Sequence, residues 1–331
     1  MLILLTGATG FLGAHLALQL LDAGYHVRAL YRSQAKRDNH PLFSKAVIDQ
    51  IEWIEGDMFD QEVLLKAMQG VDRVYHCAAM VSFGRGQQAA LMRTNVTGTA
   101  EVVNSCLAAG VPRLVYVSSI AALGRDPIQP KVSESTPWKD GPHNSPYALS
   151  KFRAENEVWR GMEEGLEVIV VNPSVILGPG DWQEGSNRLF RTVYQGLKVY
   201  SPGQTGFVDV RDVAAAMIQL DQNDFLGKRF LLNGANLRYK TLFENIAKAF
   251  GVKPPRWCPP RWMSEVGWRL FAIISFFTQK EPFITRETVK SAYNSFEYDG
   301  SKICRELGFS YRPIEATIQE SCAFMRQRII G

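Results

Sequence analysis

Short apolar runs alternate with amphipathic stretches along the first two thirds of the chain. The apolar runs predict strands at residues 2–5, 26–31, 51–55, 71–77, 114–118, 166–171 and 228–233. Between them, apolar residues recur at helical spacing, as at residues 61–68, 91–109 and 148–164. This repeated alternation predicts an α/β fold in which about seven parallel strands form a doubly wound sheet with right-handed crossovers.

The alternation ends after Asn233, where the sequence becomes helical in pattern and rich in tryptophan and proline. We expect this region to form a smaller, mainly helical C-terminal lobe that covers the substrate. The expected sheet domain comprises residues 1–172 and about 206–234, and the substrate-binding lobe comprises about 173–205 and 235–331.

A glycine-rich turn, GATGFLG at residues 7–13, directly follows the first apolar run and precedes a helical pattern that ends near Gly24. The order strand, glycine turn and helix is the context of a dinucleotide-binding loop, because the backbone must approach a pyrophosphate at a helix N-terminus. Glycine-rich loops also make ordinary turns, so this motif gains weight only together with others.

Tyr147 and Lys151 place a phenol and an ammonium on one face of a predicted helix. Such a pair is most often a solvated surface, but a nearby cation lowers a tyrosine's pKa and favours proton transfer near neutral pH. The strand pattern at 114–118 ends in two hydroxyls, Ser118 and Ser119. Ligands of open α/β sheets bind at the carboxyl ends of strands, so the three motifs together indicate a redox enzyme.

These motifs resemble those of the extended short-chain dehydrogenase/reductase family, also called the NAD-dependent epimerase/dehydratase family, from Met1 to about Asp212. The resemblance implies a Rossmann-type fold, a nicotinamide dinucleotide cofactor, and Ser119, Tyr147 and Lys151 as catalytic residues. Lys151 would bind the nicotinamide ribose, and Ser119 the substrate oxygen. The expected cofactor contacts are Gly7, Thr9, Gly10, Phe11, Leu12, Gly13, Arg32, Asp57, Met58, Ala78, Ala79, Ser118, Tyr147, Lys151, Pro173, Val175 and Ile176.

The residues after the second strand indicate which dinucleotide fits. An acidic side chain there would bind the ribose hydroxyls of NAD, whereas an arginine accommodates the extra phosphate of NADP. Arg32 lies near the expected position, Lys36 and Arg37 follow, and no acidic residue occurs before Asp38. We therefore predict NADP, with NAD as the alternative; these basic residues could also be solvated loop charges. Asp57 would reach the adenine, or would simply cap a turn.

The sequence determines the reaction class less closely than it determines the catalytic residues. Family members that act on sugar nucleotides usually carry a diphosphate-binding arginine where this chain has Thr205, and dehydratases carry acidic residues where Ile120, Ala121 and Ala122 follow Ser119. The stretches 170–173 and 178–181 look more like dihydroflavonol-reductase and 3β-hydroxysteroid-dehydrogenase relatives. We therefore expect an oxidoreductase for small, mostly apolar, ring-containing carbonyls or alcohols, with a nucleotide-sugar epimerase/dehydratase second and a catalytically silent dinucleotide-binding protein third.

Apolar side chains supply the expected walls of the substrate pocket: Met80, Val81, Phe83, Trp182 and the aromatic segment 257–283. The part from Val266 to Phe277 also fits a membrane contact. It is far shorter than the roughly 20 residues of a membrane-spanning helix, and Arg269 interrupts it, so a core or lid helix is the favoured interpretation.

Composition narrows the function classes. The net charge is +4, from 37 basic and 33 acidic residues, without a basic block, which gives no support to nucleic-acid binding. The five cysteines lack a C-x-x-C pair and fit reduced thiols in a cytoplasmic protein. The five histidines show no metal-ligand spacing, so we expect no metal.

The two predicted helices at 91–109 and 148–164 carry more apolar residues than one sheet-facing stripe requires. Examples are Val102, Leu107, Phe152, Trp159 and Met162. The resemblance implies that these helices pair with their twofold mates, so we predict a homodimer. Alternatively, the extra apolar residues contact neighbouring helices of the same chain.

Overall fold

A parallel sheet of seven strands forms the centre of the computed structural model, which describes residues 1–330 except 83, 85, 127–129, 142–143 and 264–292. The strand order is β3-β2-β1-β4-β5-β7-β10, and every neighbouring pair is parallel. From β1 the sheet grows first toward one edge, through β2 and β3, and then toward the other, from β4 onward. The switch point therefore lies between β1 and β4, and doubly wound sheets bind ligands at such a point. The strands are β1 (Leu2–Thr6), β2 (His26–Tyr31), β3 (Ile51–Glu55), β4 (Arg73–His76), β5 (Arg113–Val117), β7 (Glu167–Pro173) and β10 (Lys228–Leu232). All seven strands expected from the sequence are therefore confirmed.

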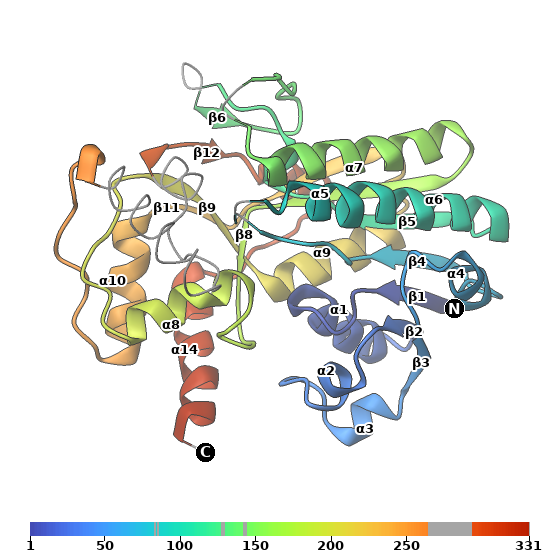
Figure 1. Ribbon diagram of the computed structural model, residues 1–331, viewed down its shortest axis with the longest axis horizontal. Coiled ribbons are helices and arrows are strands. Elements are labelled where there is room, and N and C mark those ends of the chain that lie inside the picture. Colours follow the sequence, from blue (N-terminus) through green and yellow to red (C-terminus); the bar gives the residue numbers. More distant parts are fainter. Residues whose placement is uncertain (83, 85, 127–129, 142–143, 264–292, 331) are drawn as a thin grey trace.

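Helices cover both faces of this sheet (Figure 1). Ile3 and Leu5 of β1 pack with α1 (Phe11–Asp22) and α9 (Val210–Gln222), whereas Leu4 packs on the opposite face. The opposite face is covered by α4 (Gln61–Ala67), α6 (Gly98–Ala109) and α7 (Pro146–Glu163). The strands are apolar on both faces because both faces are buried.

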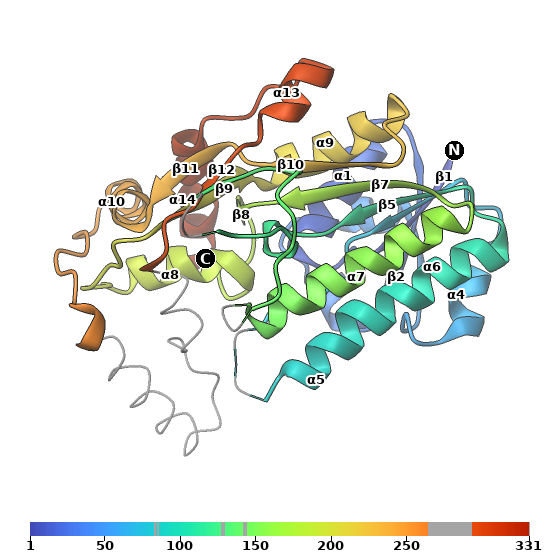
Figure 2. The same ribbon diagram turned by 90° about the horizontal axis from the view of Figure 1, so that it is seen from above.

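The expected helix 91–109 is interrupted in the structure. It consists of α5 (Gln88–Leu91), a π-helical turn η1 (Met92–Thr97) and α6, which ends at Gly110 with a left-handed φ of 68°. The expected helix 148–164 is α7, which begins two residues earlier because Ser145 caps it by accepting a hydrogen bond from the Ala148 N–H at 3.0 Å. In Figure 2, α6 and α7 lie side by side along the sheet.

The C-terminal region is mainly helical, as expected, and also contains a small sheet that the sequence analysis did not predict. Its strands are β8 (Val175–Leu177), β9 (Gln204–Asp209) and β11 (Ala235–Arg238), and its helices are α8 (Arg188–Tyr194), α10 (Tyr239–Phe250) and α14 (Ile314–Ile330). These elements share one apolar core and lie at one end of the main sheet (Figure 1). The exact division of the chain between sheet domain and lobe stays a prediction.

The remaining elements are short: α2 (Gln34–Asp38), α3 (Lys45–Ile48), the 3-10 turns η2 (Ile120–Ala122) and η3 (Gly185–Asn187), α13 (Ser301–Leu307), and the parallel pair β6 (Lys131–Val132) and β12 (Glu297–Tyr298). In the part of the chain that the structure describes, no helix is long and apolar enough to cross a lipid bilayer. The described residues likewise contain no group of three or more histidine, cysteine or acidic side chains that could hold a metal ion.

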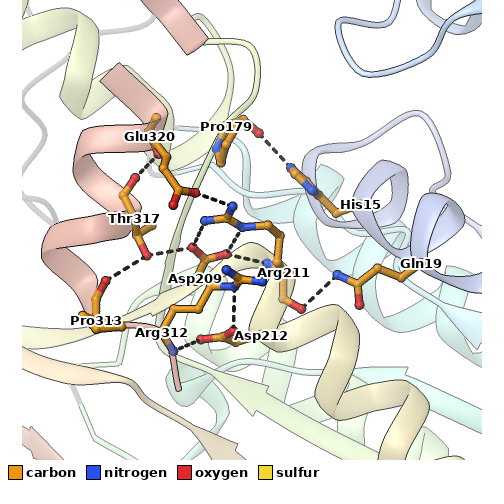
Figure 3. A network of polar contacts seen from close by, with 11 residues as sticks. His15, Gln19, Pro179, Asp209, Arg211, Asp212, Arg312, Pro313, Thr317 and Glu320 are labelled. Carbon is orange, nitrogen blue, oxygen red and sulfur yellow. Dashed lines mark hydrogen bonds and ion pairs between the residues drawn. The ribbon is translucent and has the colours of Figure 1, made fainter. Parts of the chain in front are cut away.

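A polar network attaches α14 to the sheet domain (Figure 3). The fully buried carboxylate of Asp209 accepts hydrogen bonds from Thr317 Oγ1 of α14 at 2.7 Å and from Arg211 Nη2 at 2.6 Å. Arg211 Nη1 donates a hydrogen bond to Glu320 of α14 at 2.5 Å, and Gln19 of α1 donates to the Arg211 carbonyl oxygen at 3.0 Å. The junction of β9 and α9 therefore connects α1 with the lobe.

Candidate active site

The glycine turn after β1 leaves room for a phosphate group. Gly7 has a left-handed φ of 73°. Its Cα lies close to the segment after β4, so that a Cβ at Gly7 would be 2.7 Å from the Ala78 nitrogen. A Cβ at Gly13 would be 2.1 Å from the Gly7 carbonyl oxygen. Only glycine fits these positions, and the N–H groups of Phe11, Leu12 and Gly13 begin α1 without partners in the preceding turn. This geometry fits the pyrophosphate of a dinucleotide.

Tyr147 and Ser119 come from different elements and meet at the carboxyl end of the sheet. Tyr147 is in the first turn of α7, and Ser119 begins the turn η2 directly after β5. Burial raises the pKa of Tyr147, while the neighbouring Ser119 hydroxyl and the positive charge of Arg125 act in the opposite direction.

Lys151 is buried one turn further along α7, and its ammonium is held by two protein acceptors. Its Nζ donates to the Tyr116 hydroxyl at 2.9 Å and to the Val117 carbonyl oxygen at 2.8 Å. In the chain without cofactor, burial dominates the pKa of Tyr147 and the cation that lowers it is Arg125, so the effect of Lys151 on this pKa stays a prediction. Two of the three ammonium hydrogens are engaged within the protein, which leaves one for a ribose hydroxyl.

A buried polar chain extends behind Lys151, and the sequence analysis missed it. The Thr99 hydroxyl lowers the pKa of Tyr116 and lies 3.1 Å from His76 Nε2. The His76 ring stacks on Tyr116, and its Nδ1 lies 2.6 Å from the Thr6 hydroxyl at the end of β1. Burial lowers the pKa of His76 to about 3, so this ring is neutral and links Lys151 to the strand that precedes the glycine turn.

Glu155 is a second residue that the sequence analysis missed. This buried carboxylate accepts hydrogen bonds from Ser118 Oγ at 2.5 Å and from Asn172 Nδ2 at 2.8 Å, and it pairs with Arg229 Nη2 at 3.2 Å. Asn172 Nδ2 also donates to the Ser119 carbonyl oxygen at 3.1 Å. The Ser118 hydroxyl, which we expected to contact the cofactor, is thus engaged by Glu155. The sequence signal was available: Glu155 follows Lys151 by one helical turn on the buried face of α7.

Asn95 fixes the loop after β4 to α7. Its Oδ1 accepts from the Met80 N–H at 2.7 Å, and its Nδ2 donates to the Met80 carbonyl oxygen at 3.0 Å and to Ser150 Oγ at 2.9 Å. Ser150 Oγ in turn donates to the Tyr147 carbonyl oxygen at 2.8 Å. The backbone at Ala78, Ala79 and Met80 is therefore held in a fixed relation to the helix that carries Tyr147.

The expected adenosine contacts lie together after β2 and β3. Arg32 Nη1 is 3.5 Å from Asp57 Oδ2, and both side chains are largely exposed. Asp57 Oδ1 also accepts from the Phe59 N–H at 3.2 Å, so it does stabilise a turn. Met58 is buried against Gly98 of α6. Lys36 pairs with Glu184 at 2.8 Å and Arg37 with Asp38 at 2.7 Å. The ion pair of Arg32 is the longest of the three, so its guanidinium is the most available to a ligand.

Residues 173–176 join the two sheets. Pro173 ends β7 beside Leu232 of β10, and Val175 and Ile176 begin β8 beside Phe207 and Val208. The Phe11 ring packs against Gly178 and Gly180, and a Cβ at Gly180 would be only 2.8 Å from the ring. Thr9 and the turn around it are thereby placed next to this crossing, as a cofactor that spans both would require.

The expected pocket walls are only partly brought together. Met80 is beside the site, and Val81 is exposed. Trp182 packs on Tyr194 of α8, with ring centroids 5.5 Å apart, and on the core of the lobe. Phe83 and residues 264–283 lie outside the described residues, and Trp257 at the start of the aromatic segment is half exposed.

Comparison with known proteins agrees with this geometry. The NAD dependent epimerase/dehydratase family matches residues 3–230. A dihydroflavonol 4-reductase, so named, of Synechocystis is 29% identical over 96% of this chain and 92% of its own length. Sterol demethylase protein B of Methylococcus capsulatus is 30% identical over 98% of both chains. The crystal structure of gox2253 superimposes with a TM-score of 0.82 and 29% identity over 99% of this chain and 98% of that one.

Proposed function

The chain belongs to the NAD dependent epimerase/dehydratase family, and on this premise we propose that it reduces the carbonyl group of a small, mostly apolar, ring-containing compound, or oxidises the alcohol. It is an NAD(P)-dependent oxidoreductase, and the substrate class is the part that we infer. The observation that carries the proposal is that Ser119 and Tyr147 lie together at the carboxyl end of the sheet, one helical turn from the buried ammonium of Lys151.

Each of these residues has a distinct task. Ser119 would donate a hydrogen bond to the substrate oxygen and stabilise negative charge that develops there. Tyr147 would deliver its proton to that oxygen during reduction and remove it during oxidation. Lys151 would bind the nicotinamide ribose through its remaining hydrogen. When bound, the nicotinamide supplies or accepts the hydride.

The substrate class rests on the residues around the reacting oxygen. Buried apolar side chains, Ile120, Ala121 and Ala122, follow Ser119, so no carboxylate stands there for a dehydration. Thr205 on β9 occupies the position where sugar-nucleotide enzymes of the family usually carry a diphosphate-binding arginine. The names of the two relatives refer to a dihydroflavonol and a sterol, both of which are ring systems.

The test is a screen of carbonyl compounds with NADPH or NADH, followed by absorbance of the reduced cofactor. We expect turnover with ring-containing ketones or aldehydes, and none with UDP-glucose. Epimerisation of UDP-glucose would instead favour the second candidate, a nucleotide-sugar epimerase/dehydratase. Tight dinucleotide binding without turnover of any compound would favour the third, a catalytically silent binding protein.

We infer a preference for NADP from Arg32, whose exposed guanidinium follows β2 and would pair with a ribose phosphate. Arg32→Asp should reverse the ratio of affinities toward NAD, because it replaces a phosphate partner with a hydroxyl partner. Titration of both cofactors against both proteins checks this. Arg188→Asp on α8 is the control for charge alone, and a wild-type preference for NAD would contradict the inference.

A cytoplasmic location and a homodimer complete the proposal. All five cysteines are free, which fits a reducing compartment. The dimer rests on the family resemblance of α6 and α7, because the apolar residues of these helices pack in the chain's own core.

A further inference from the structure

Arg125 ends the turn that begins at the catalytic Ser119, and tight backbone packing fixes its position. A Cβ at the preceding Gly124 would lie 1.7 Å from the Pro137 carbonyl oxygen, so the two backbones are in direct contact. Trp138 stacks on Phe152 of α7, with nearly parallel rings 4.4 Å apart. Arg125 is therefore held in a defined place relative to the helix that carries Tyr147.

An aromatic ring lies near Arg125, and two tyrosines feel its charge. Its guanidinium carbon lies 5.9 Å from the centroid of the Phe296 ring. Its charge lowers the pKa of Tyr147 and of Tyr239, against the larger raising effect of burial at both. Tyr239 is the first residue of α10. The cation therefore acts on the reacting tyrosine of the sheet domain and on the first residue of α10 in the lobe that is expected to cover the substrate.

Arg125 differs from the buried Arg113 in its lack of a counter-charge. Arg113 pairs with Glu167, Asp221 and Asp224 at 2.7 to 2.9 Å. In the described part of the chain no carboxylate pairs with Arg125, and its Nε is buried without a hydrogen-bond partner. A partly buried guanidinium that lacks a partner is costly, and its planar donors fit a carboxylate.

We propose that Arg125 is an anion-binding residue of the substrate site, and that the substrate carries a carboxylate near the carbonyl or alcohol that Ser119 and Tyr147 bind. The inference rests on the proposed function of these two residues. It narrows the substrate class from mostly apolar ring compounds to ring compounds with one acidic group.

The turnover test compares aromatic keto acids of increasing chain length, benzoylformate being the shortest, with their methyl esters. For at least one pair we expect wild type to prefer the acid in kcat/KM. Arg125→Gln should lower kcat/KM for that acid by about 10- to 100-fold and leave kcat/KM for the ester nearly unchanged, because only the acid loses a charge-assisted hydrogen bond.

Arg125→Lys should restore part of the loss in kcat/KM for the acid. Lys66→Gln, at an exposed position of α4 far from the proposed site, is the control. An equal loss for acid and ester would show that Arg125 acts on Tyr147 alone and would overturn the proposal.

A binding test separates failure of this proposal from failure of the proposed reductase function. Benzoate does not react, and its affinity for the protein saturated with NADP can be measured by calorimetry even if no ketone is turned over. We expect benzoate to bind wild type at least about tenfold more tightly than Arg125→Gln, with equal cofactor affinity in both. Absence of benzoate binding to wild type, or equal affinity in both proteins, contradicts the anion site.

Discussion

At the scale of single residues, the candidate site consists of polar groups that are buried and held by one another. The Ser119 hydroxyl acts on Tyr147, Lys151 donates a hydrogen bond to Tyr116, and Glu155 accepts hydrogen bonds from Ser118 and Asn172. Burial alone disfavours both the tyrosinate and the lysine ammonium, so the free protein holds Tyr147 as a neutral phenol. A neutral phenol is the form that a proton donor in carbonyl reduction requires.

Removal of the Tyr147 hydroxyl tests this arrangement. Tyr147→Phe should lower kcat by about 100-fold or more, because positioned acid–base catalysis contributes on that order. Cofactor affinity and thermal stability should change little, since the ring remains. Tyr194→Phe, at a half-exposed position on α8, is the matched control. Near-normal turnover in the first variant would remove Tyr147 from the mechanism.

The pH dependence of cofactor binding tests Glu155 through Lys151. Burial lowers the pKa of Lys151 to about 8, and the negative charge of Glu155 acts in the opposite direction. Cofactor affinity should therefore fall as the pH rises through about 8, where the ammonium loses its proton. Glu155→Gln should move this fall to lower pH, because the charge that favours the ammonium is gone.

Glu157→Gln is the matched control for that experiment, because Glu157 is on the same helix and pairs only with Arg160, at 2.8 Å, among its described contacts. Lys151→Met should bind the cofactor weakly at every pH. A loss of affinity in Glu155→Gln that is the same at all pH values would mean that the carboxylate has a structural role only.

The sequence identifies the reacting groups but not what holds them. Tyr147, Lys151 and Ser119 are recognisable by their spacing and by their place at a strand end and a helix start. Tyr116, His76 and Thr99 come from β5, β4 and α6, and only the packing of these elements brings them together behind Lys151. Arg125 is likewise placed by the contact of Gly124 with Pro137, which no local pattern indicates.

At the scale of elements, the parallel strands were predictable because burial on both faces gives each a continuous apolar run. The strands β8, β9 and β11 were not predicted as a sheet, since β8 and β11 have only three and four residues and β11 alternates partly buried with exposed positions instead of forming a continuous apolar run. The π-turn η1 interrupts a helix whose apolar pattern is otherwise continuous, and it is the place where Asn95 turns its amide to Met80.

The junction of β9 and α9 determines how firmly α14 is attached. Asp209→Asn should lower the free energy of unfolding by about 3 kcal/mol, because it leaves the partly buried Arg211 without its main counter-charge. Thr317→Val removes a single hydrogen bond to the same carboxylate and should cost about 1 kcal/mol.

Urea denaturation of wild type and both variants measures these changes. Exposed Glu315→Gln on α14 serves as the control. Equal stability of wild type and Asp209→Asn would show that the network in Figure 3 does not attach the helix.

At the scale of the whole molecule, the sequence argument for a homodimer does not survive the structure. Val102, Val103 and Val158 are fully buried in the chain's own core, and Val96, Leu107, Trp159 and Met162 pack against it. Phe152 stacks on Trp138. The apolar residues that suggested a second chain are therefore used within one chain, as the alternative interpretation held.

If two copies associate through α6 and α7, they meet through polar side chains. Asn104 and Arg160 are hydrogen-bonded at 2.7 Å between the two helices, and Arg153 and Asn156 are exposed on α7. A polar interface of this kind is sensitive to charge, so Arg153→Glu should weaken it strongly.

We expect light scattering at micromolar concentration to give twice 37.1 kDa for wild type and 37.1 kDa for the variant. The exchange Lys66→Glu on α4, outside this surface, should leave the mass unchanged. A wild-type mass of 37.1 kDa would contradict the dimer and would mean that each chain closes its active site without a partner.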